Sequence, residues 1–596
     1  MEKVKKRVAD IIIEELIKNY ITDCFAVVGG GAMHLDNALA IHEDMHKFFN
    51  HHEQACAMAA EAYARLSGKM ACVCVTSGPG AINTLNGVAG AWEDSIPMLV
   101  LSGQVRYETS VEKTGLSLRY RGVQEFEIVE SVKNMTKYAV KLKDPKGVRR
   151  EINKAIHIAL SGRRGPVWLD IPLDIQSALV EEEELEENEI YEPLPEVRHE
   201  ALEALKQILL QAKRPCILAG SAIISSDVKD EFRAFIAQVQ IPVIAGSGLA
   251  DVLPVSYERY YGCSGNIGSR AGNFILQNSD TILVLGNSLS FRQTGFAQEA
   301  FAPKAAIIMV DIDENESKKP GLRIKQFIHT TLKDFFRSMQ IDGFAMTCSS
   351  KWIDYCETVK SHFTVYEGKD SPECEERVGQ YNFWEVYNTS IPDDMITVLG
   401  NNTAVCAKQQ TGVRTLDQKV VVNYTIGSMG YDLPAAIGAA VASKKDIICA
   451  TGDGSIMMNL QEMQTIKHYE LPIKIILFSN GGYNAIRQTC TNFFNGVFIG
   501  CTAETGVSFP DFEQVAKLFG FEYRRCENNF EIKECVDWLL QSGGNVLLDV
   551  QEKFDDPLIP KVMSRMNEDG TFSTPALHDM YPFLPVEKID RFMIKE

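Results

Sequence analysis

Residues 450–482 read "ATGDGSIMMNLQEMQTIKHYELPIKIILFSNGG" and indicate the class of fold. The apolar run "DIICA" leads into a glycine-rich turn around Asp453, and a second run, "IKIILFS", ends at Asn480 and two glycines. Such runs are typical of strands buried on both faces of a parallel sheet, and we expect one helix to join them. Because the carboxyl ends of parallel strands meet at one edge of the sheet, the two turns are expected to open onto a common site.

The same alternation of apolar strand and helix fills most of the chain, which predicts an α/β protein of three doubly wound parallel-sheet domains. The expected strands and the turns that follow them are "CFAVVGGG", "ACVCVTSGPG", "MLVLSGQ" and "PVWLDIP" in the first domain, "PCILAGSA", "PVIAGSG", "TILVLGNS" and "AAIIMVDID" in the second, and "MITVLGNN", "DIICATGDG", "IKIILFSNGG" and "NVLLDV" in the third.

An acidic run at 181–189, "EEEELEENE", predicts a solvated linker after the first domain. We therefore expect domains over residues 1–180, 193–345 and 375–560. Residues 561–596 carry proline and charge without strong periodicity, and we expect them to form a tail packed on the surface.

Composition excludes several classes of protein. The net charge of −19 argues against a nucleic-acid partner, which would need clustered Lys and Arg. No run of about 18 apolar residues occurs, so no membrane span is expected. The 15 cysteines are scattered, without a CxxC pair, and predict buried thiols in the reducing cytoplasm.

The two glycine-rich turns have the composition of a metal and phosphate site. Asp453, Asn480 and the main-chain carbonyl of Gly482 offer the hard oxygen ligands that Mg²⁺ prefers. Gly452 and Gly454 allow the backbone to approach a phosphate, and Ser455 opens a helix whose N–H groups favour an anion. Either turn alone would be unremarkable, but the pair predicts a cradle for a diphosphate bridged by Mg²⁺. A P-loop is excluded because no Gly-Lys-Ser/Thr follows.

"GDGS" followed at this spacing by asparagine resembles the thiamine-diphosphate motif, and the surrounding sequence resembles the acetolactate synthase family. The likeness extends over nearly the whole chain. It is carried by "NHHEQACAMAAEAYARLSG" (50–68), "TSGPGAINTLNGVAGAWEDSIPMLVLSGQV" (76–105), "GRRGPVWLDIPLDIQ" (162–176), "DTILVLGNSLSFRQTG", "IIMVDID" and "GSMGYDLPAAIGAAVA" (427–442).

This resemblance implies catalytic roles for three residues. Glu53 matches the glutamate that hydrogen-bonds the pyrimidine ring of the coenzyme in this family. His52 beside it matches the family histidine, and Gln124 in "GVQEFEIVE" matches an active-site glutamine.

Further residues are implied to bind the coenzyme. Met429 matches the bulky side chain under the bend of the coenzyme. Asn401 and Asn402 match diphosphate contacts, where the family usually has Gln and His. Gly427, Gly30 and Gly31 are expected to lie against the coenzyme as well. The family places each site between the first domain of one subunit and the third domain of another, which predicts a homodimer or homotetramer.

The sequence departs from acetolactate synthases at positions that bear on the substrate. Leu173 stands where they carry lysine, Thr489 replaces a tryptophan of the acceptor pocket, and Val123 replaces a phenylalanine. Arg119 and Arg121 lie in a loop longer than the family norm.

The resemblance implies that the chain decarboxylates a 2-keto acid, with pyruvate as the donor. The departures predict that the acyl unit is transferred to an acceptor larger than pyruvate. The segments "LRYRGVQEFEIV" and "LHDMYPFLP" resemble thiamine enzymes of unusual sugar biosynthesis, which implies a sugar or a nucleotide-linked ketosugar. A simple 2-keto-acid decarboxylase and a true acetolactate synthase remain alternatives. An oxidase of the same fold is a further alternative, and the intact Glu53, Asp453 and Asn480 argue against a non-catalytic relative.

Flavin is left open by the sequence. Arg163 and Arg292 match the flavin-contacting arginines of the family, but "LSFRQTG" lacks the acidic residues that usually precede the second one.

Overall fold

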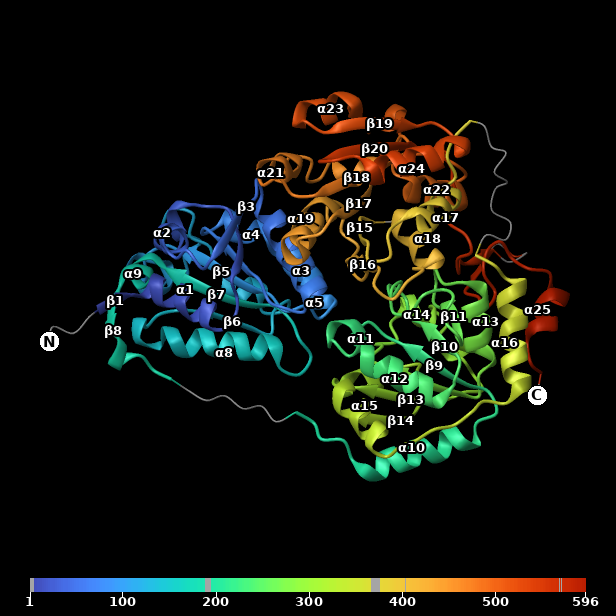
Figure 1. Cartoon of the computed structure of the whole chain (residues 1–596). Coiled ribbons are helices and arrows are strands. Elements are labelled where there is room, and N and C mark those ends of the chain that lie inside the picture. The colour runs from blue at the N-terminus through green and yellow to red at the C-terminus, as the bar shows by residue number, and fades with distance from the viewer. Residues whose placement is uncertain are drawn as a thin grey trace.

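The computed structural model describes residues 5–187, 194–365, 376–401, 403–566, 569 and 571–595. Three six-stranded sheets, each parallel throughout, form the centres of three domains, as the sequence predicts (Figure 1). The domain boundaries themselves stay a prediction. None of the helices in the described ranges has the length and apolar character that a membrane crossing needs.

The first sheet has the order β3-β2-β4-β5-β7-β6. Glycine-rich or polar turns follow β2, β3, β4 and β5 at one edge of this sheet, which places residues 29–31, 50–53, 76–78 and 104–105 near one another. The strands are β2 (Asp23–Ala26), β3 (His46–Phe49), β4 (Cys72–Val75), β5 (Leu99–Gln104), β6 (Tyr138–Lys141) and β7 (Val167–Pro172), and the main helices are α1 (Val8–Lys18), α2 (Met33–Ile41), α3 (Glu53–Ser67), α5 (Leu85–Glu93) and α8 (Val148–Leu160).

The second sheet has the order β11-β10-β9-β12-β13-β14. Its strands are β9 (Pro215–Ala219), β10 (Val243–Ala245), β11 (Tyr260–Cys263), β12 (Thr281–Leu285), β13 (Ala306–Asp311) and β14 (Ile324–His329), and its main helices are α10 (His199–Gln211), α12 (Lys229–Val239), α13 (Arg270–Asn278), α15 (Leu332–Ile341) and α16 (Ser350–His362).

The third sheet has the order β16-β15-β17-β18-β20-β19. Its strands are β15 (Ile396–Leu399), β16 (Lys419–Val421), β17 (Ile447–Gly452), β18 (Ile473–Ser479), β19 (Glu522–Cys526) and β20 (Val546–Gln551), and its helices are α17 (Gln380–Ser390), α18 (Thr403–Thr411), α19 (Asp432–Ser443), α20 (Asp453–Ile456), α21 (Glu462–His468), α22 (Asn484–Phe493), α23 (Phe512–Phe519) and α24 (Ile532–Gln541).

The expectation of one helix between the two glycine-rich turns is wrong. The chain forms α20, a single turn, and α21, separated by residues 457–461. Asn459 in this break donates from Nδ2 to the carbonyl of Gly430 (2.7 Å), so the interruption holds a neighbouring turn in place.

The C-terminal residues pack on the second domain. α25 (Val586–Phe592) lies beside α13 and α16, where the Phe592 ring packs at a tilt against Phe274 and edge-on against Phe363. Asn273 donates to the carbonyl of Leu577 (3.0 Å).

α3 and α19 lie side by side and join the first domain to the third (Figure 1). A Cβ atom on Gly438 would lie 2.0 Å from the carbonyl oxygen of Ala59, so only glycine allows the two backbones to come this close. One apolar cluster runs continuously from the first sheet through both helices into the third sheet. The two domains therefore share a core, and the sites at their strand ends are held at a fixed separation.

Candidate active site

The turns after β17 and β18 meet at the side chain of Asp453, as predicted from the sequence. Its Oδ2 accepts hydrogen bonds from the main-chain N–H groups of Asn480 (3.0 Å) and Gly481 (2.7 Å), and its Oδ1 accepts from that of Gly454 (2.8 Å). Asp453 is buried, and this burial raises its pKa to about 6. A carboxylate retains free lone pairs after three such bonds and can still bind a cation.

Asn480 and Gly482 complete the loop. The Asn480 amide donates to Glu552 Oε2 (2.8 Å) and accepts from Arg487 Nη2 at Oδ1 (3.1 Å). Gly482 has φ 156°, and a Cβ there would lie 2.0 Å from the carbonyl oxygen of Cys501. The loop therefore requires glycine at this position.

The donors fit a magnesium diphosphate. A carboxylate, an amide oxygen and a main-chain carbonyl are hard ligands, few enough to leave positions for phosphate oxygens. A cavity of about 880 Å³ opens at Asp453, Asn480 and Gly481. The buried Glu552 Oε1 also lines it and lacks a hydrogen-bond partner among the described residues.

Gly452 ends β17, and Gly454 and Ser455 lie within α20, which Asp453 rather than Ser455 begins. The Ser455 hydroxyl has partners within the chain. It donates to Asp432 Oδ2 (2.5 Å) and accepts from the N–H of Gly430 (2.9 Å). Its side chain therefore fixes the turn at 427–430. Gly454 packs against the ring of Tyr483, which a Cβ would approach to 2.2 Å.

The turn 427–430 lies between the metal loop and the first domain. The Gly427 carbonyl accepts from Asn401 Nδ2 (3.2 Å), and Ser428 Oγ donates to Asn86 Oδ1 (2.6 Å) at the start of α5. Met429 Cε approaches to 3.4 Å of where a Gly454 Cβ would stand. Asn402 lies outside the described residues.

Glu53 is the first residue of α3 and lies near Gly80, whose Cβ would stand 3.4 Å from its Oε1. Its Oε2 accepts from Asn83 Nδ2 (3.0 Å). His52 caps the helix, with Nδ1 accepting from the N–H of Gln54 (3.1 Å), which leaves the proton of the neutral imidazole on Nε2.

Glu462 anchors this segment to the third domain. This buried carboxylate accepts from Asn50 Nδ2 (2.8 Å) and the N–H of His51 (3.0 Å). These contacts hold the segment before α3 against the third domain of the same chain, whereas the resemblance implies a site shared by two subunits. The homo-oligomer stays a prediction.

Gly30 and Gly31 follow β2 at the same edge of the first sheet. The N–H of Gly31 donates to Thr76 Oγ1 (2.9 Å) in the turn after β4, and a Cβ on Gly31 would lie 2.6 Å from Ser77 Oγ. Gly31 therefore lets neighbouring strand ends approach closely, whereas a Cβ on Gly30 would meet no atom within 4 Å.

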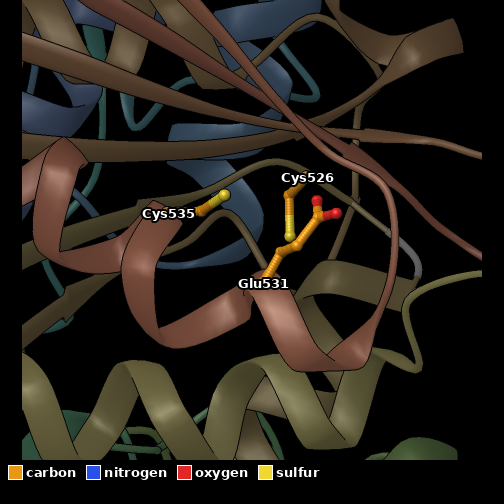
Figure 2. Close-up of side chains that lie close together, drawn as sticks. All are labelled: Cys526, Glu531 and Cys535. Atoms are coloured by element: carbon orange, nitrogen blue, oxygen red, sulfur yellow. The ribbon is translucent and has the colours of Figure 1, made fainter. Parts of the chain in front are cut away.

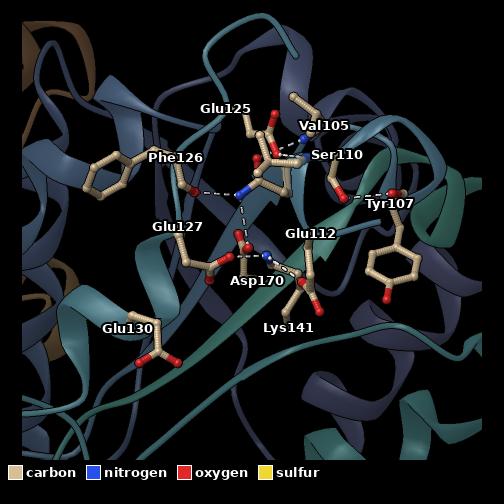
Figure 3. Close-up of polar contacts among 12 residues, drawn as sticks. Val105, Tyr107, Ser110, Glu112, Glu125, Phe126, Glu127, Glu130, Lys141 and Asp170 are labelled. Carbon is tan, nitrogen blue, oxygen red and sulfur yellow. Dashed lines mark hydrogen bonds and ion pairs between the residues drawn. The ribbon is translucent and has the colours of Figure 1, made fainter. Parts of the chain in front are cut away.

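Gln124 lies in a loop over residues 105–127 that polar contacts fasten to the first sheet (Figure 3). Gln104 Nε2 donates to the carbonyl of Phe126 (2.9 Å) and to Asp170 (3.0 Å), a carboxyl group whose pKa burial raises to about 7. The Glu125 carboxylate accepts from three main-chain N–H groups of the loop, and Lys141 pairs with Glu112 and Glu127. Gln124 itself is exposed with φ 60°, and its carbonyl packs against Gly78.

The two arginines expected at a flavin have different surroundings. Arg163 reaches the second domain, where it pairs with Glu316 (2.7 Å) and Asp313 (3.1 Å). Arg292 is exposed, with its guanidinium 4.9 Å from the ring centre of Tyr424.

A separate group of metal-binding residue types lies between β19 and α24, formed by Cys526, Glu531 and Cys535 (Figure 2). Both sulfurs are directed to main-chain carbonyls, and Glu531 accepts from the N–H of Glu527 (2.8 Å). These groups satisfy one another within the fold, as expected of buried thiols.

Sequence reasoning missed Asn83, Glu462, Glu552 and Arg487. The segment "QEKFDD" (551–556) carries a signal, since it places a carboxylate directly after a strand that neighbours β18. Arg487 is the one charged residue between Asn480 and Phe494, and this isolation is a second signal in the sequence.

Comparison with known proteins identifies the family. Three models match in chain order: the N-terminal TPP binding domain of thiamine pyrophosphate enzymes at residues 6–128, their central domain at 202–335 and their C-terminal TPP binding domain at 399–550. Together they cover most of the chain.

Relatives align with almost all of it. The large subunit of acetolactate synthase isozyme 2 from Escherichia coli (strain K12) is 29% identical, over 93% of this chain and 97% of its own length. The chloroplastic acetolactate synthase of Arabidopsis thaliana is 29% identical, over 95% and 83%. The large subunit from Lactococcus lactis subsp. lactis (strain IL1403) is 27% identical, over 94% and 95%. The chain therefore belongs to the thiamine pyrophosphate enzymes, as a thiamine-diphosphate-dependent enzyme similar over almost its whole length to acetolactate synthases.

Proposed function

We propose that this enzyme decarboxylates a 2-keto acid, with pyruvate as the donor, and joins the remaining two-carbon unit to a carbonyl acceptor, using thiamine diphosphate and Mg²⁺. The observation that carries the proposal is that the turn 427–430 contacts both domains of the chain. Ser428 donates to Asn86, three residues after the Glu53 partner Asn83, and Met429 packs beside Gly454, next to Asp453. When bound, thiamine diphosphate supplies an electron sink beside the substrate carbonyl.

The third domain would hold the charged end of the coenzyme. Asp453, Asn480 Oδ1 and the Gly482 carbonyl would ligate Mg²⁺. Gly452, whose Cβ position meets only the Phe478 carbonyl at 4.0 Å, would leave room for phosphate oxygens, and Gly454 makes room for the Tyr483 ring. Asn401 and Asn402 would donate hydrogen bonds to the diphosphate.

The first domain would handle protons. The Glu53 carboxylate, positioned by Asn83, would hold a proton shared with the pyrimidine ring. His52 presents its Nε2 proton at the same helix end and would donate it to a developing negative charge. Gln124 would contact the acceptor.

For the acceptor, we propose a ketone larger than pyruvate, of the anionic sugar or nucleotide-linked ketosugar class. In support, Val123 is 86% exposed and Thr489 is exposed, so neither fills the acceptor side. Arg119 and Lys141 line a cavity of about 270 Å³ beneath the loop 105–127. A second candidate, condensation of two pyruvates to acetolactate, is favoured by the printed names of the relatives.

Product analysis separates the candidates. The purified protein is incubated with pyruvate, Mg²⁺ and thiamine diphosphate, with and without a panel of ketoses, and the products are identified by mass spectrometry. Branched hydroxyketones that depend on the added ketose support the proposal. Rapid acetolactate formation from pyruvate alone supports the second candidate, and acetaldehyde alone supports a simple decarboxylase.

Glu53→Gln tests the class of reaction. We expect turnover to fall by about 10² to 10⁴, the size of a lost proton-transfer group, while coenzyme binding is retained because the metal loop is intact. Unchanged turnover in Glu53→Gln would contradict the assigned role. As a control, Glu93→Gln alters an exposed acid at the far end of α5 and is expected to be silent.

We also propose a homo-oligomer, supported by large apolar side chains that project from α22 and the loop after it. Phe494, Val497 and Ile499 are 60%, 71% and 77% exposed. Sedimentation velocity of the wild type and of Ile499→Asp provides the test, with a shift of the variant toward monomer expected.

The flavin is testable by colour. Arg163 already has two acidic partners, which weakens its case as a flavin contact, while Arg292 is exposed. If the purified wild type shows flavin absorption and the Arg292→Ala variant does not, the protein binds a flavin that depends on Arg292.

A further inference from the structure

The side chain of Asn480 lies between two buried side chains, the carboxyl group of Glu552 and the guanidinium of Arg487. Glu552 follows β20 and is 1% exposed, and Arg487 on α22 is fully buried. Neither was expected from the resemblance to known enzymes, and the two approach the amide from opposite ends. Isolated buried charges are costly to a fold, so this arrangement calls for a physical reason.

The contacts fix the amide in one orientation. Asn480 Nδ2 donates to Glu552 Oε2 (2.8 Å), which a flipped amide would replace with two facing oxygens. At the other end, Arg487 Nη2 donates to Asn480 Oδ1 (3.1 Å) and to the Asn480 main-chain oxygen (3.3 Å). The amide can therefore neither flip nor turn away.

Arg487 is itself held in place by the segment after β20. Its Nη2 also donates to the carbonyl of Phe554, and its guanidinium carbon lies 3.9 Å from the centre of the Phe554 ring. Nε lies 3.8 Å from Asp555 Oδ1. Nε and Nη1 have no hydrogen-bond partner in the part of the chain that the structure describes. The guanidinium is thus positioned mainly by its contacts with Asn480 and Phe554.

This geometry leaves one ligand position on Asn480. An amide oxygen has two lone pairs, and Arg487 occupies one of them. The second remains available on the loop whose N–H groups also hold Asp453. Groups behind a metal ligand that fix its orientation typically change metal affinity by about 10- to 100-fold when removed.

We propose that Glu552 and Arg487 are positioning residues that orient the Asn480 amide for a divalent cation. The proposal rests on the metal role of Asp453 and Asn480 given above. It predicts that hydrogen bonding, rather than the net charge of either residue, determines how tightly the cation binds.

Paired substitutions separate orientation from charge. In Glu552→Gln the side-chain amide oxygen can still accept from Asn480 Nδ2, whereas Glu552→Leu removes the acceptor. In Arg487→Lys the ammonium can still donate to Asn480 Oδ1, whereas Arg487→Met removes the donor. We expect cation affinity to fall about 10-fold or more in the Leu and Met variants. The Gln and Lys variants should stay within about threefold of the wild type, less than the loss of one net hydrogen bond would cause.

The readout is binding, measured without turnover. Mn²⁺ is titrated into the full-length protein with thiamine diphosphate present, and bound Mn²⁺ is measured by the loss of the free-ion paramagnetic resonance signal. Near-ultraviolet circular dichroism checks that each variant is folded. Arg270→Met is the matched control, because Arg270 is a buried arginine that donates to the Met580 carbonyl (3.1 Å) in another part of the molecule. Its Mn²⁺ affinity should equal that of the wild type.

Asp453→Ala separates a failure of the proposed metal site from a failure of the positioning role. If Asp453→Ala binds Mn²⁺ as tightly as the wild type, the proposed metal site itself fails. If Asp453→Ala abolishes binding but the Leu and Met variants bind normally, the positioning role fails alone. Equal losses in Glu552→Gln and Glu552→Leu would show that charge decides, which would also overturn it.

Discussion

At the scale of single residues, two adjacent glycines in the metal loop have different reasons to be glycine. Gly481 has φ 73° and open space around its Cβ position, so Gly481→Ala adds only backbone strain, about 1 kcal/mol. Gly482 faces the Cys501 carbonyl, which a Cβ would approach to 2.0 Å. We expect Gly482→Ala to lower the thermal midpoint clearly more than Gly481→Ala and to weaken Mn²⁺ binding. Equal effects in calorimetry and titration would contradict this account.

Lys408 is a buried lysine that packs near aromatic rings. It is 1% exposed, donates to Asn388 and to the Gly412 carbonyl, and lies near the rings of Trp384 and Tyr387. Burial lowers its pKa from 10.5 to about 7, with Asp251 acting in the opposite direction. Between pH 7 and pH 10.5 the unfolded chain therefore binds a proton that the folded chain lacks, so the free energy of unfolding from this group rises with pH.

The prediction concerns Lys408→Met, which removes this titration. From pH 7.5 to 9.5, the free energy of unfolding of the wild type, measured by urea titration, should rise relative to that of the variant. The rise should be at most about 1.4 kcal/mol for each pH unit. Lys333→Met, at an exposed lysine on α15, should show no such trend. A constant difference between wild type and Lys408→Met would show that Lys408 is charged in the fold at neutral pH.

At the scale of elements, the loop 105–127 depends on one carboxylate. Glu125 accepts from the N–H groups of Val111 (2.6 Å), Arg121 (2.9 Å) and Gly122 (2.7 Å). Glu125→Ala leaves these donors without their acceptor, which frees a segment that carries exposed Arg119 and Arg121.

We expect trypsin to cleave Glu125→Ala after these arginines about tenfold faster than the wild type, with little change in the thermal midpoint. Glu108→Ala is the control, since Glu108 lies in the same loop and its side chain pairs with the exposed Lys113. Faster cleavage in both variants would mean that the loop is simply open.

At the scale of the whole molecule, buried charges help to join the first and third domains. Glu61 on α3 is fully buried and bonds both Arg65 and the hydroxyl of Tyr431, which precedes α19. Arg65 also pairs with Asp94 (2.6 Å). Arg65→Met would leave Glu61 without its cation, and removing one member of a buried pair costs about 3–5 kcal/mol.

The expected result is a large fall in the urea midpoint of Arg65→Met, with part of the loss recovered in the double variant Glu61→Gln/Arg65→Met. The exposed pair of Lys133 and Glu130 supplies the comparison, and Lys133→Met should change the midpoint little. If the double variant is no better than the single one, the cost lies in packing.

The sequence predicted those features that depend on local pattern and on the topology of parallel sheets. Apolar runs ending in glycine predicted the three sheets, and shared strand polarity predicted that Asp453 and Asn480 meet. Glu552 and Arg487 were not predicted, because their hydrogen bonds to Asn480 depend on the directions of side chains from β20, β18 and α22. The break between α20 and α21 was not predicted either, because a contact from Asn459 to another segment determines it.

The backbone contact between α3 and α19 has a consequence for how this enzyme can change. Where Gly438 contacts Ala59, main-chain atoms determine the distance between the two helices, and no change of side chain can shorten it. Substitutions in the loop before α7 (Ile128–Val132) or in the segment after α22 can therefore accumulate without changing the distance between α3 and α19.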